Sequence, residues 1–348
     1  MGISQGRKVG RIFCFSTTPH HTPLTFFENL FATEKNYHLI ATLSQRKYNF
    51  AAMRILILGA NGFVGRRIMQ QLAQCDNHSL TASSLRPDLC PGPGYEFIEA
   101  DMCQADALAS LFEGCCPEVV INAAALSVVD YCEQHPDEAL RMNTTAVEWL
   151  AQRCAESGCR LLHLSTDFVF DGHKGAPYTE DDLPCPVNHY GKTKWLAEQA
   201  IVRHTANHAI LRVEVVYGRP LAGQHGNIAL LVKQRLEQGQ AMRVASDQWR
   251  TPTFVGDICQ AVEALLSPTH CGTFHIAGGE QMSIAELALR TARHFGLDTS
   301  LLEPMATATM QEATPRPQAT PLSIEKARQA FGYAPHTLEE GLRELAEA

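Results

Sequence analysis

The stretch LGANGFVGRRIMQQL, from Leu58 to Leu72, carries three glycines, each three residues after the last. Gly59, Gly62 and Gly65 follow an apolar run and open a segment with helical spacing of its apolar residues. After a strand, the first glycine allows a tight turn, the second lets the backbone approach a pyrophosphate, and the third lets the helix pack closely. The same triplet also fits a turn that binds nothing, so residues further along the chain must decide.

The composition excludes several classes of function. The chain has 348 residues, of which 45% are hydrophobic and 19% charged, and its net charge is −8. A negative chain is poorly suited to nucleic acid or to an anionic membrane surface. No segment approaches the roughly 20 continuous apolar residues of a membrane helix. We therefore expect a cytoplasmic protein that binds neither nucleic acid nor membranes.

The cysteines and histidines do not form a metal or disulfide pattern. The twelve cysteines include no CxxC spacing, and several stand within apolar helix or strand patterns. Small buried thiols in a reducing cytoplasm explain them better than disulfides. The fifteen histidines show no HExxH spacing. We expect no metal site.

The first 52 residues differ from the rest of the chain. They are basic, have neither helical nor strand periodicity, and end where Met53 stands directly ahead of the first strand pattern. We interpret residues 1–52 as a disordered or mis-assigned N-terminal extension, with a transit peptide as the alternative. A chain that begins at Met53 is expected to fold and to bind its cofactor unchanged.

From Met53 onward, apolar strand patterns alternate with helical patterns. The strand-like runs are Arg54–Leu58, Ser79–Ser83, Tyr95–Ala100, Glu118–Ala124, Arg160–Ser165 and Ala209–Tyr217. The helical patterns include Phe63–Cys75, Asp106–Phe112, Asp137–Glu156, Ile228–Gln238, Ile324–Phe331 and Leu338–Ala346. This alternation predicts an α/β protein with a doubly wound parallel sheet, the Rossmann fold, whose ligands lie at the carboxyl ends of the strands.

The alternation loosens after Tyr217, which indicates a second, smaller α/β domain for substrate binding. We expect residues 53–215 plus about 253–277 to form the NAD(P)-binding domain, and residues 216–252 plus 278–348 to form the substrate-binding domain. The segment Pro304–Pro321 is rich in proline and threonine and predicts a lid or binding loop.

Four features at later strand ends support a dinucleotide site. Asp101 ends the third strand, and the small residues of Asn122–Ala125 end the fourth. The run Leu164–Phe170 places hydroxyls at the end of the fifth strand. Tyr190 and Lys194 then open a helix at a spacing that sets both on one face. Together these features indicate that the glycine turn holds a dinucleotide.

Four longer motifs add a family resemblance. They are NAAALSVVDYCE (Asn122–Glu133), STDFVFDG (Ser165–Gly172), YGKTKWLAE (Tyr190–Glu198) and RPQATPLSIEKARQAFG (Arg316–Gly332). From Met53 to its end, the chain resembles the dTDP-4-dehydrorhamnose reductase branch of the extended short-chain dehydrogenase/reductase family. The resemblance implies a reductase that uses a nicotinamide cofactor to reduce the 4-keto group of a deoxysugar nucleotide.

The resemblance implies Thr166, Tyr190 and Lys194 as the catalytic residues. Ketone reduction needs a hydride on carbon and a proton on the developing alkoxide. Tyr190 would give the proton, and Thr166 would hold the carbonyl oxygen. Lys194 would bond the nicotinamide ribose, and its ammonium would lower the pKa of Tyr190 toward the working pH.

The end of the second strand, TASSLRP, predicts NADP as the cofactor, with NAD as the alternative. No acidic residue stands before Asp88, whereas Ser83, Ser84 and Arg86 could bind a 2′-phosphate. The complete set of expected cofactor-binding residues is Gly59, Asn61, Gly62, Phe63, Val64, Gly65, Ser83, Ser84, Arg86, Asp101, Met102, Ala123, Ala124, Ala125, Tyr190 and Lys194.

The substrate pocket departs from the family pattern. Phe168 stands where a tyrosine is usual, Val215 where an aromatic residue is usual, and Gln224–Ile228 is not the usual loop. The expected substrate-binding residues are Asp167, Phe168, Gln248 and Trp249.

Two alternatives stay open besides a nucleotide-sugar reductase. One is an epimerase or dehydratase of the same extended family. The other is a non-catalytic, cofactor-binding regulatory subunit resembling that of methionine adenosyltransferase. The expected partners are a nucleotide-sugar substrate and a second copy of the chain in a homodimer.

Overall fold

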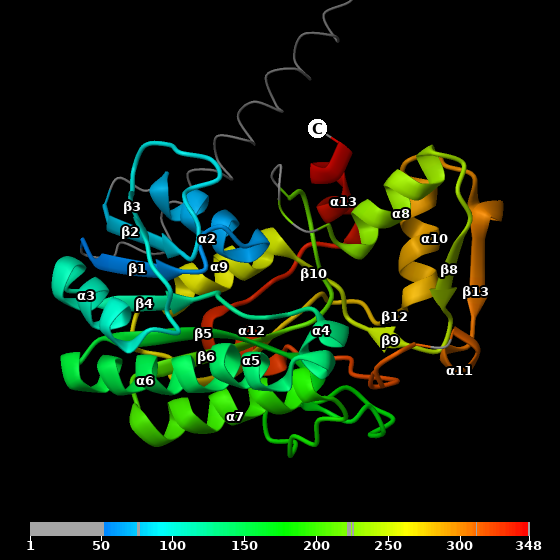
Figure 1. Ribbon diagram of the computed structural model, residues 1–348. Helices are drawn as coiled ribbons and strands as arrows, with labels where there is room; N and C mark the ends of the chain where they lie inside the picture. Colours follow the sequence, from blue (N-terminus) through cyan, green and yellow to red (C-terminus); the bar gives the residue numbers. More distant parts are fainter. Residues whose placement is uncertain (1–51, 75–76, 221–223, 225, 311, 347–348) are drawn as a thin grey trace, which may run out of the picture. The chain divides into compact units, whose positions relative to one another are not determined.

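The computed structural model describes residues 52–74, 77–220, 224, 226–310 and 312–346, so the expected N-terminal extension lies outside it apart from its last residue. A seven-stranded sheet forms the centre of the described chain, in the order β11-β6-β5-β4-β1-β2-β3 (Figure 1). Every neighbouring pair in this sheet is parallel. Its strands are β1 (Arg54–Leu58), β2 (Ser79–Ser84), β3 (Glu96–Glu99), β4 (Val119–Asn122), β5 (Arg160–Thr166), β6 (His208–Val213) and β11 (Gly272–Ile276).

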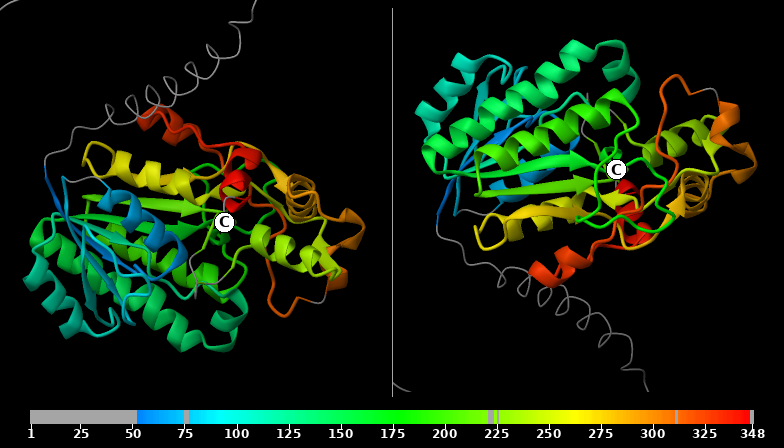
Figure 2. Two further views of the ribbon diagram at one scale, coloured as in Figure 1. Left: turned by 90° about the horizontal axis from the view of Figure 1, so that it is seen from above. Right: turned by 90° about the horizontal axis from the view of Figure 1, so that it is seen from below.

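Helices cover both faces of the sheet, and Figure 2 shows the strands between the yellow α9 and the green α6 and α7. The helices α2 (Phe63–Ala73), α9 (Val255–Leu265) and α12 (Glu325–Phe331) pack into one apolar cluster with the sheet. The helices α3 (Ala105–Cys115), α6 (Ala146–Ser157) and α7 (His189–His204) pack into the other. Because both faces are covered, strands such as β1 and β4 are almost entirely apolar and buried. The predicted doubly wound fold is confirmed.

The strand register brings the predicted strand ends to one edge of the sheet. Leu58 at the end of β1 lies opposite both Ser83 and Asn122. Thr166 at the end of β5 lies opposite Val213. The glycine turn and the polar residues after β2, β4 and β5 therefore leave the sheet on the same side.

Two elements differ from the sequence-based expectation. The helix expected at Asp137–Glu156 consists of α5 (Pro136–Leu140), a π-helical turn (Arg141–Thr145) and α6. The strand expected at Ala209–Tyr217 breaks after β6, because Val215 adopts a left-handed φ of 41°. Beyond this break, β7 (Val216–Tyr217) pairs with β10 (Thr253–Phe254) outside the main sheet.

A smaller group of elements follows β7. The helices α8 (Ile228–Glu237) and α10 (Ile284–His294) share an apolar cluster with β8 (Met242–Ala245), which pairs with β13 (Leu302–Met305). The remaining elements are α4 (Val129–Gln134), the 3-10 turns η2 (Asp167–Val169) and η3 (Thr299–Leu301), β9 (Trp249–Arg250), β12 (Met282–Ser283), α11 (Thr307–Met310) and α13 (Leu338–Ala346). In the described part of the chain, no helix has both the length and the apolar character that a bilayer span requires.

Candidate functional site

The glycine turn after β1 has the geometry that only glycine allows. Gly59 has a φ of 78°, and a Cβ there would lie 2.6 Å from the backbone nitrogen of Ala124 after β4. A Cβ on Gly65 would lie 2.3 Å from the Gly59 carbonyl oxygen, so α2 packs directly against the turn. Gly62 is the N-cap of α2 and is exposed, no side-chain hydrogen bond caps the helix, and the Gln224 amide donates to the carbonyls of Asn61 (3.0 Å) and Gly62 (3.1 Å). The free N–H groups of that turn form a surface suited to phosphate.

Asn61 fixes the loop after β2 instead of facing outward. Its side-chain amide donates to the carbonyls of Arg86 (3.0 Å) and Pro87 (2.9 Å), and its Oδ1 accepts from Arg66 (3.0 Å). The turn after β1 and the loop after β2 are thereby joined. This contact places the predicted phosphate-binding residues beside the start of α2, where Phe63 and Val64 are partly buried.

The predicted 2′-phosphate residues differ in exposure. Ser83 is buried, and its carbonyl accepts from the N–H groups of Gly59 and Ala60. Ser84 is partly exposed and the Arg86 side chain is exposed. The nearby Asp88 is paired with the buried Arg66. Burial opposes ionisation of Asp88, but hydrogen bonds from Arg66 and Tyr95 outweigh it and hold the pKa of this carboxyl below its usual value.

The third and fourth strand ends also lie at this edge. The Asp101 carboxylate accepts from the N–H of Cys103 (2.9 Å), and Met102 is buried. Ala123, Ala124 and Ala125 are partly exposed after β4. Asn143, which the sequence reasoning missed, accepts from the N–H of Leu126 (2.8 Å) and donates to its carbonyl (2.9 Å). It projects from the π-helical turn, and such turns are frequent at functional sites.

The start of α7 holds Tyr190 against the turn after β5. Asn188 caps the helix by accepting from the N–H of Gly191 (2.8 Å). A Cβ on Gly191 would lie 2.1 Å from the carbonyl oxygen of Phe168, so only glycine allows this contact. The rings of Phe168 and Tyr190 meet edge to face at 5.9 Å. The structure therefore brings Thr166, Phe168 and Tyr190 together.

The pKa of Tyr190 is not lowered in this site. Burial raises it well above the usual range, and the opposing effect of a hydrogen bond with Thr166 is smaller. The expectation of a lowered tyrosine pKa is therefore wrong. The main reason is that burial disfavours the phenolate.

The Lys194 side chain binds two groups of β5. Its Nζ lies 3.1 Å from Nε2 of His163 and donates to the carbonyl of Leu164 (2.6 Å). Burial lowers the pKa of Lys194 to about 8, although Glu198 opposes the change. His163 was also missed from the sequence, although a histidine in an otherwise apolar strand was a signal.

The four expected substrate-binding residues are placed differently from one another. Phe168 is partly exposed beside Tyr190, and Trp249 is 40% exposed. The Gln248 amide is buried and donates to Glu312 and Thr307. Asp167 is buried and lies in an ion pair with Arg250, so its carboxylate serves a contact within the protein.

Arg250 is the centre of a buried polar cluster that the sequence reasoning did not predict. Its Nε lies 3.5 Å from Asp167 and 3.7 Å from Glu214, and all three side chains are at most 4% exposed. Its other nitrogens donate to the carbonyls of Pro317 (2.7 Å) and Gln318 (3.1 Å). The C-terminal part of the expected lid, Pro304–Pro321, is thus held through Arg250 to the residues that follow β5 and β6.

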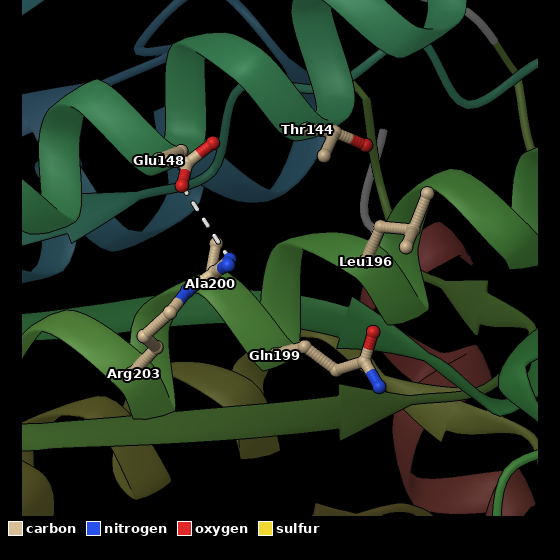
Figure 3. Close-up of a pocket in the computed structure, with 6 residues that line it drawn as sticks. All are labelled: Thr144, Glu148, Leu196, Gln199, Ala200 and Arg203. Carbon is tan, nitrogen blue, oxygen red and sulfur yellow. Dashed lines mark ion pairs between the residues drawn. The ribbon is translucent and has the colours of Figure 1, made fainter.

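Two further observations concern a metal site and a surface hollow. Among the residues that the structure describes, no group of His, Cys, Asp or Glu side chains is arranged to hold a metal ion. A surface hollow of about 490 Å³ lies on α6 and α7, lined by Thr144, Glu148, Leu196, Gln199, Ala200 and Arg203 (Figure 3). Glu148 and Arg203 pair across it at 3.4 Å, and none of the predicted site residues lines it.

Comparison with known proteins agrees with this architecture. Residues 53–348 match the family described as RmlD substrate binding domain. The chain belongs to this family. The match begins at Met53, immediately ahead of β1, and covers both the sheet and the smaller group of elements.

Two relatives of this RmlD family chain illustrate the likeness. The beta subunit of methionine adenosyltransferase 2 from Rattus norvegicus is 31% identical over 82% of this chain and 84% of its own. The spore coat polysaccharide biosynthesis protein SpsK of Bacillus subtilis is 31% identical over 84% of this chain and 97% of its own.

Among solved structures, a dTDP-4-dehydrorhamnose reductase of Clostridium acetobutylicum is 29% identical, with a TM-score of 0.76 over 85% of this chain and 99% of its own. The corresponding enzyme of Bacillus anthracis in complex with NADP has the same TM-score and is 23% identical, over 85% of this chain and 100% of its own. At that identity the second likeness concerns the fold.

Proposed function

We propose that this RmlD family chain is an NADP-dependent reductase of a 4-keto-6-deoxy sugar nucleotide, with NAD as the alternative cofactor. One observation supports the proposal most: Thr166 and Tyr190 meet at the edge of the sheet that also carries the glycine turn. In this proposal the cofactor binds residues 53–215 with about 253–277, and the nucleotide sugar binds residues 216–252 with 278–348.

The residues at the glycine turn fit a dinucleotide. A side chain on Gly59 or Gly65 would collide with backbone, and no side-chain hydrogen bond caps the first turn of α2. Ser84 and Arg86 stand nearby for a 2′-phosphate, and Asp88, the acid in this loop, is already neutralised by Arg66. When bound, the nicotinamide would supply the hydride.

The residues of this chain would supply the proton. A raised pKa keeps Tyr190 a neutral phenol, which is the form that can give a proton to an alkoxide. The Thr166 hydroxyl is held by Asp167, to which it donates at 3.1 Å, and by the N–H of Phe168. To position the carbonyl oxygen beside the phenol, this hydroxyl would turn its single proton from Asp167 to the substrate.

The test is NADPH oxidation with a panel of 4-keto-6-deoxy sugar nucleotides. Tyr190→Phe should lower kcat by roughly 10²- to 10⁴-fold, the usual contribution of general acid catalysis, and leave NADPH affinity nearly unchanged. Tyr131→Phe is the matched control, because that exposed tyrosine bonds Glu138 at 2.8 Å on the surface. Retention of most of the wild-type kcat by Tyr190→Phe would contradict the assignment.

A second candidate is a regulatory subunit. The likeness to the methionine adenosyltransferase 2 beta subunit, at 31% identity over 82% of the chain, favours it. Co-elution with a methionine adenosyltransferase catalytic subunit, together with no NADPH oxidation on any member of the panel, would support this candidate over the reductase.

A further inference from the structure

A buried hydrogen-bonded chain runs from β4 through β5 to α7. Asn122, His163 and Lys194 are at most 2% exposed. The side-chain amide of Asn122 lies 3.1 Å from Nδ1 of His163, and Nε2 of His163 lies 3.1 Å from Nζ of Lys194. The three side chains therefore form one continuous row beside the candidate site.

The direction of this row is set at the Asn122 end. The backbone N–H of Ala124 donates to Oδ1 of Asn122 at 3.1 Å. A backbone N–H can only donate, so the atom that faces it must be the amide oxygen, and the amide nitrogen must face His163. That nitrogen can also only donate, so Nδ1 of His163 accepts and carries no proton.

The proton of a neutral His163 is then on Nε2, facing Lys194. An ammonium has three donors and no acceptor, so it cannot accept this N–H, whereas a neutral amine can. A neutral Lys194 accepts from His163 and still donates to the carbonyl of Leu164 at 2.6 Å. A charged Lys194 would require His163 to change tautomer, with Asn122 then turning its NH₂ group toward the N–H of Ala124.

We propose that Asn122 and His163 favour the neutral amine of Lys194 over its ammonium, which makes His163 a positioning residue for the catalytic lysine. The proposal rests on the proposed function and deepens it. Asn122 influences the pH at which Lys194 takes up a proton, and it does so through His163, the residue that Lys194 contacts.

The charged groups around Lys194 are consistent with this arrangement. Glu198, one turn along α7, is the acidic group that favours the ammonium. Its carboxylate is bound by Arg212 of β6, at 2.7 and 3.0 Å, and by the hydroxyl of Ser165. His163 of β5 faces Lys194 directly, and burial lowers the pKa of this imidazole. Lys194 is therefore buried with its nearby carboxylate already paired.

The experiment reads both groups by NMR in the full chain without cofactor, so its outcome is independent of reductase activity. In lysine labelled with ¹³C at the ε carbon, the Lys194 signal, assigned with Lys194→Met, should titrate near pH 8. At a pH above this midpoint, the ¹⁵N shifts of His163 in the unmodified chain should show a neutral ring protonated on Nε2. A titration near the ordinary value of about 10.4, or a proton on Nδ1 at a pH above the Lys194 midpoint, would overturn the proposal.

A substitution that reverses the direction of the hydrogen bonds along the row tests the proposal. In Asn122→Asp both carboxylate oxygens accept, so His163 can carry its proton on Nδ1 and accept from a charged Lys194 through Nε2. The Lys194 midpoint should rise by at least about one pH unit, a tenfold change in proton affinity. In the double variant Asn122→Asp/His163→Leu most of this rise should disappear, because the row is broken while the new charge remains.

The control is His208→Leu, which removes a buried histidine that bonds the carbonyl of Thr205 instead of Lys194. It should leave the Lys194 midpoint unchanged. An unchanged or lower midpoint in Asn122→Asp would overturn the proposal, as would a full rise in the double variant. If Asn122→Asp does not fold, the His163 tautomer in the unmodified chain decides alone.

Discussion

The carboxyl ends of β1 and β2 and those of β5 and β6 lie on one edge of the sheet, but their polar groups are held in opposite ways. At β1 and β2 the backbone determines the geometry, through the left-handed Gly59, and the side chains of Ser84 and Arg86 stay exposed or partly exposed. At β5 and β6 the side chains determine it, because Asp167 and Glu214 are buried around Arg250.

The difference lies in how far along the chain each arrangement reaches. The glycine turn is formed by three glycines within seven positions, although it also contacts the backbone of Ser83 and Ala124. The buried cluster joins Asp167 to Thr320, which donates to it at 2.6 Å from 153 positions away. The first region offers free N–H groups and exposed side chains to a ligand, whereas the second fixes Thr166 and the segment near Pro317 relative to each other.

The largest effect is expected from breaking the buried cluster. Arg250→Met leaves two buried carboxyls without their cation and should lower the free energy of unfolding by about 3–5 kcal/mol. Arg153→Met, which removes an exposed pair with Glu156, should cost less than about 1 kcal/mol. Urea unfolding measures both losses, and equal losses would show that burial of the Arg250 cluster does not increase its contribution to stability.

The same cluster predicts a pH dependence. Burial raises the pKa of both Asp167 and Glu214. A carboxyl whose folded pKa exceeds its unfolded value holds its proton more tightly in the folded state, so stability falls as the pH rises from the unfolded toward the folded pKa. The deficit of Arg250→Met should therefore shrink when the pH is lowered toward the carboxyl range, which urea unfolding at several pH values would detect.

This contrast explains how much could be predicted from the sequence. The strands and the edge that gathers Gly59, Ser83 and Thr166 follow from apolar patterns and from the parallel sheet, both of which are local or topological. The partners of His163 and Arg250 could not be predicted, because they depend on contacts between strands and segments far apart in the sequence. The break at Val215 was missed for the same reason, since β7 pairs with β10.

The next prediction tests the backbone region with two left-handed glycines. Gly59→Ala should lower the free energy of unfolding by about 2–4 kcal/mol, because the new Cβ adds a collision with Ala124 to the left-handed strain. Gly158→Ala, at the C-cap of α6, has φ 69° and nothing within 4 Å of the new Cβ, so it should cost about 1 kcal/mol. Equal losses in chemical denaturation would show that close approach of β1 and β4 does not constrain Gly59.

A further prediction concerns the exposed side chains of the first region. Arg86→Ala should weaken NADPH binding by roughly 1.5–3 kcal/mol, the scale of a hydrogen bond to a charged group, and leave NADH binding almost unchanged. Arg67→Ala is the control, because that arginine pairs with Glu344 at 2.8 Å. Dissociation constants for both cofactors at fixed salt decide the matter, and equal losses for NADPH and NADH would rule out a phosphate contact.

The smallest effect on stability is expected for an ion pair in which one side chain is buried and the other is partly exposed. His336 donates through Nδ1 to Asp257, whose side chain is fully buried, while the imidazole is 40% exposed. The hydrogen bond with Asp257 raises the pKa of His336 above its usual value. A raised histidine pKa means that the folded state binds the proton more tightly, so the stabilisation is complete below the unfolded value of about 6.5. It disappears as the pH rises through the folded value. Because solvent screens the exposed ring, the pH-dependent part of the stabilisation should stay under about 1 kcal/mol.

His336→Gln, compared with the unmodified chain by thermal unfolding at about pH 5.5 and about pH 9, should therefore show a larger loss of stability at the lower pH. A deficit that is equal at both pH values, or larger at the higher one, would mean that the charge of His336 does not contribute and that partial exposure is enough to cancel a pair with a buried carboxylate.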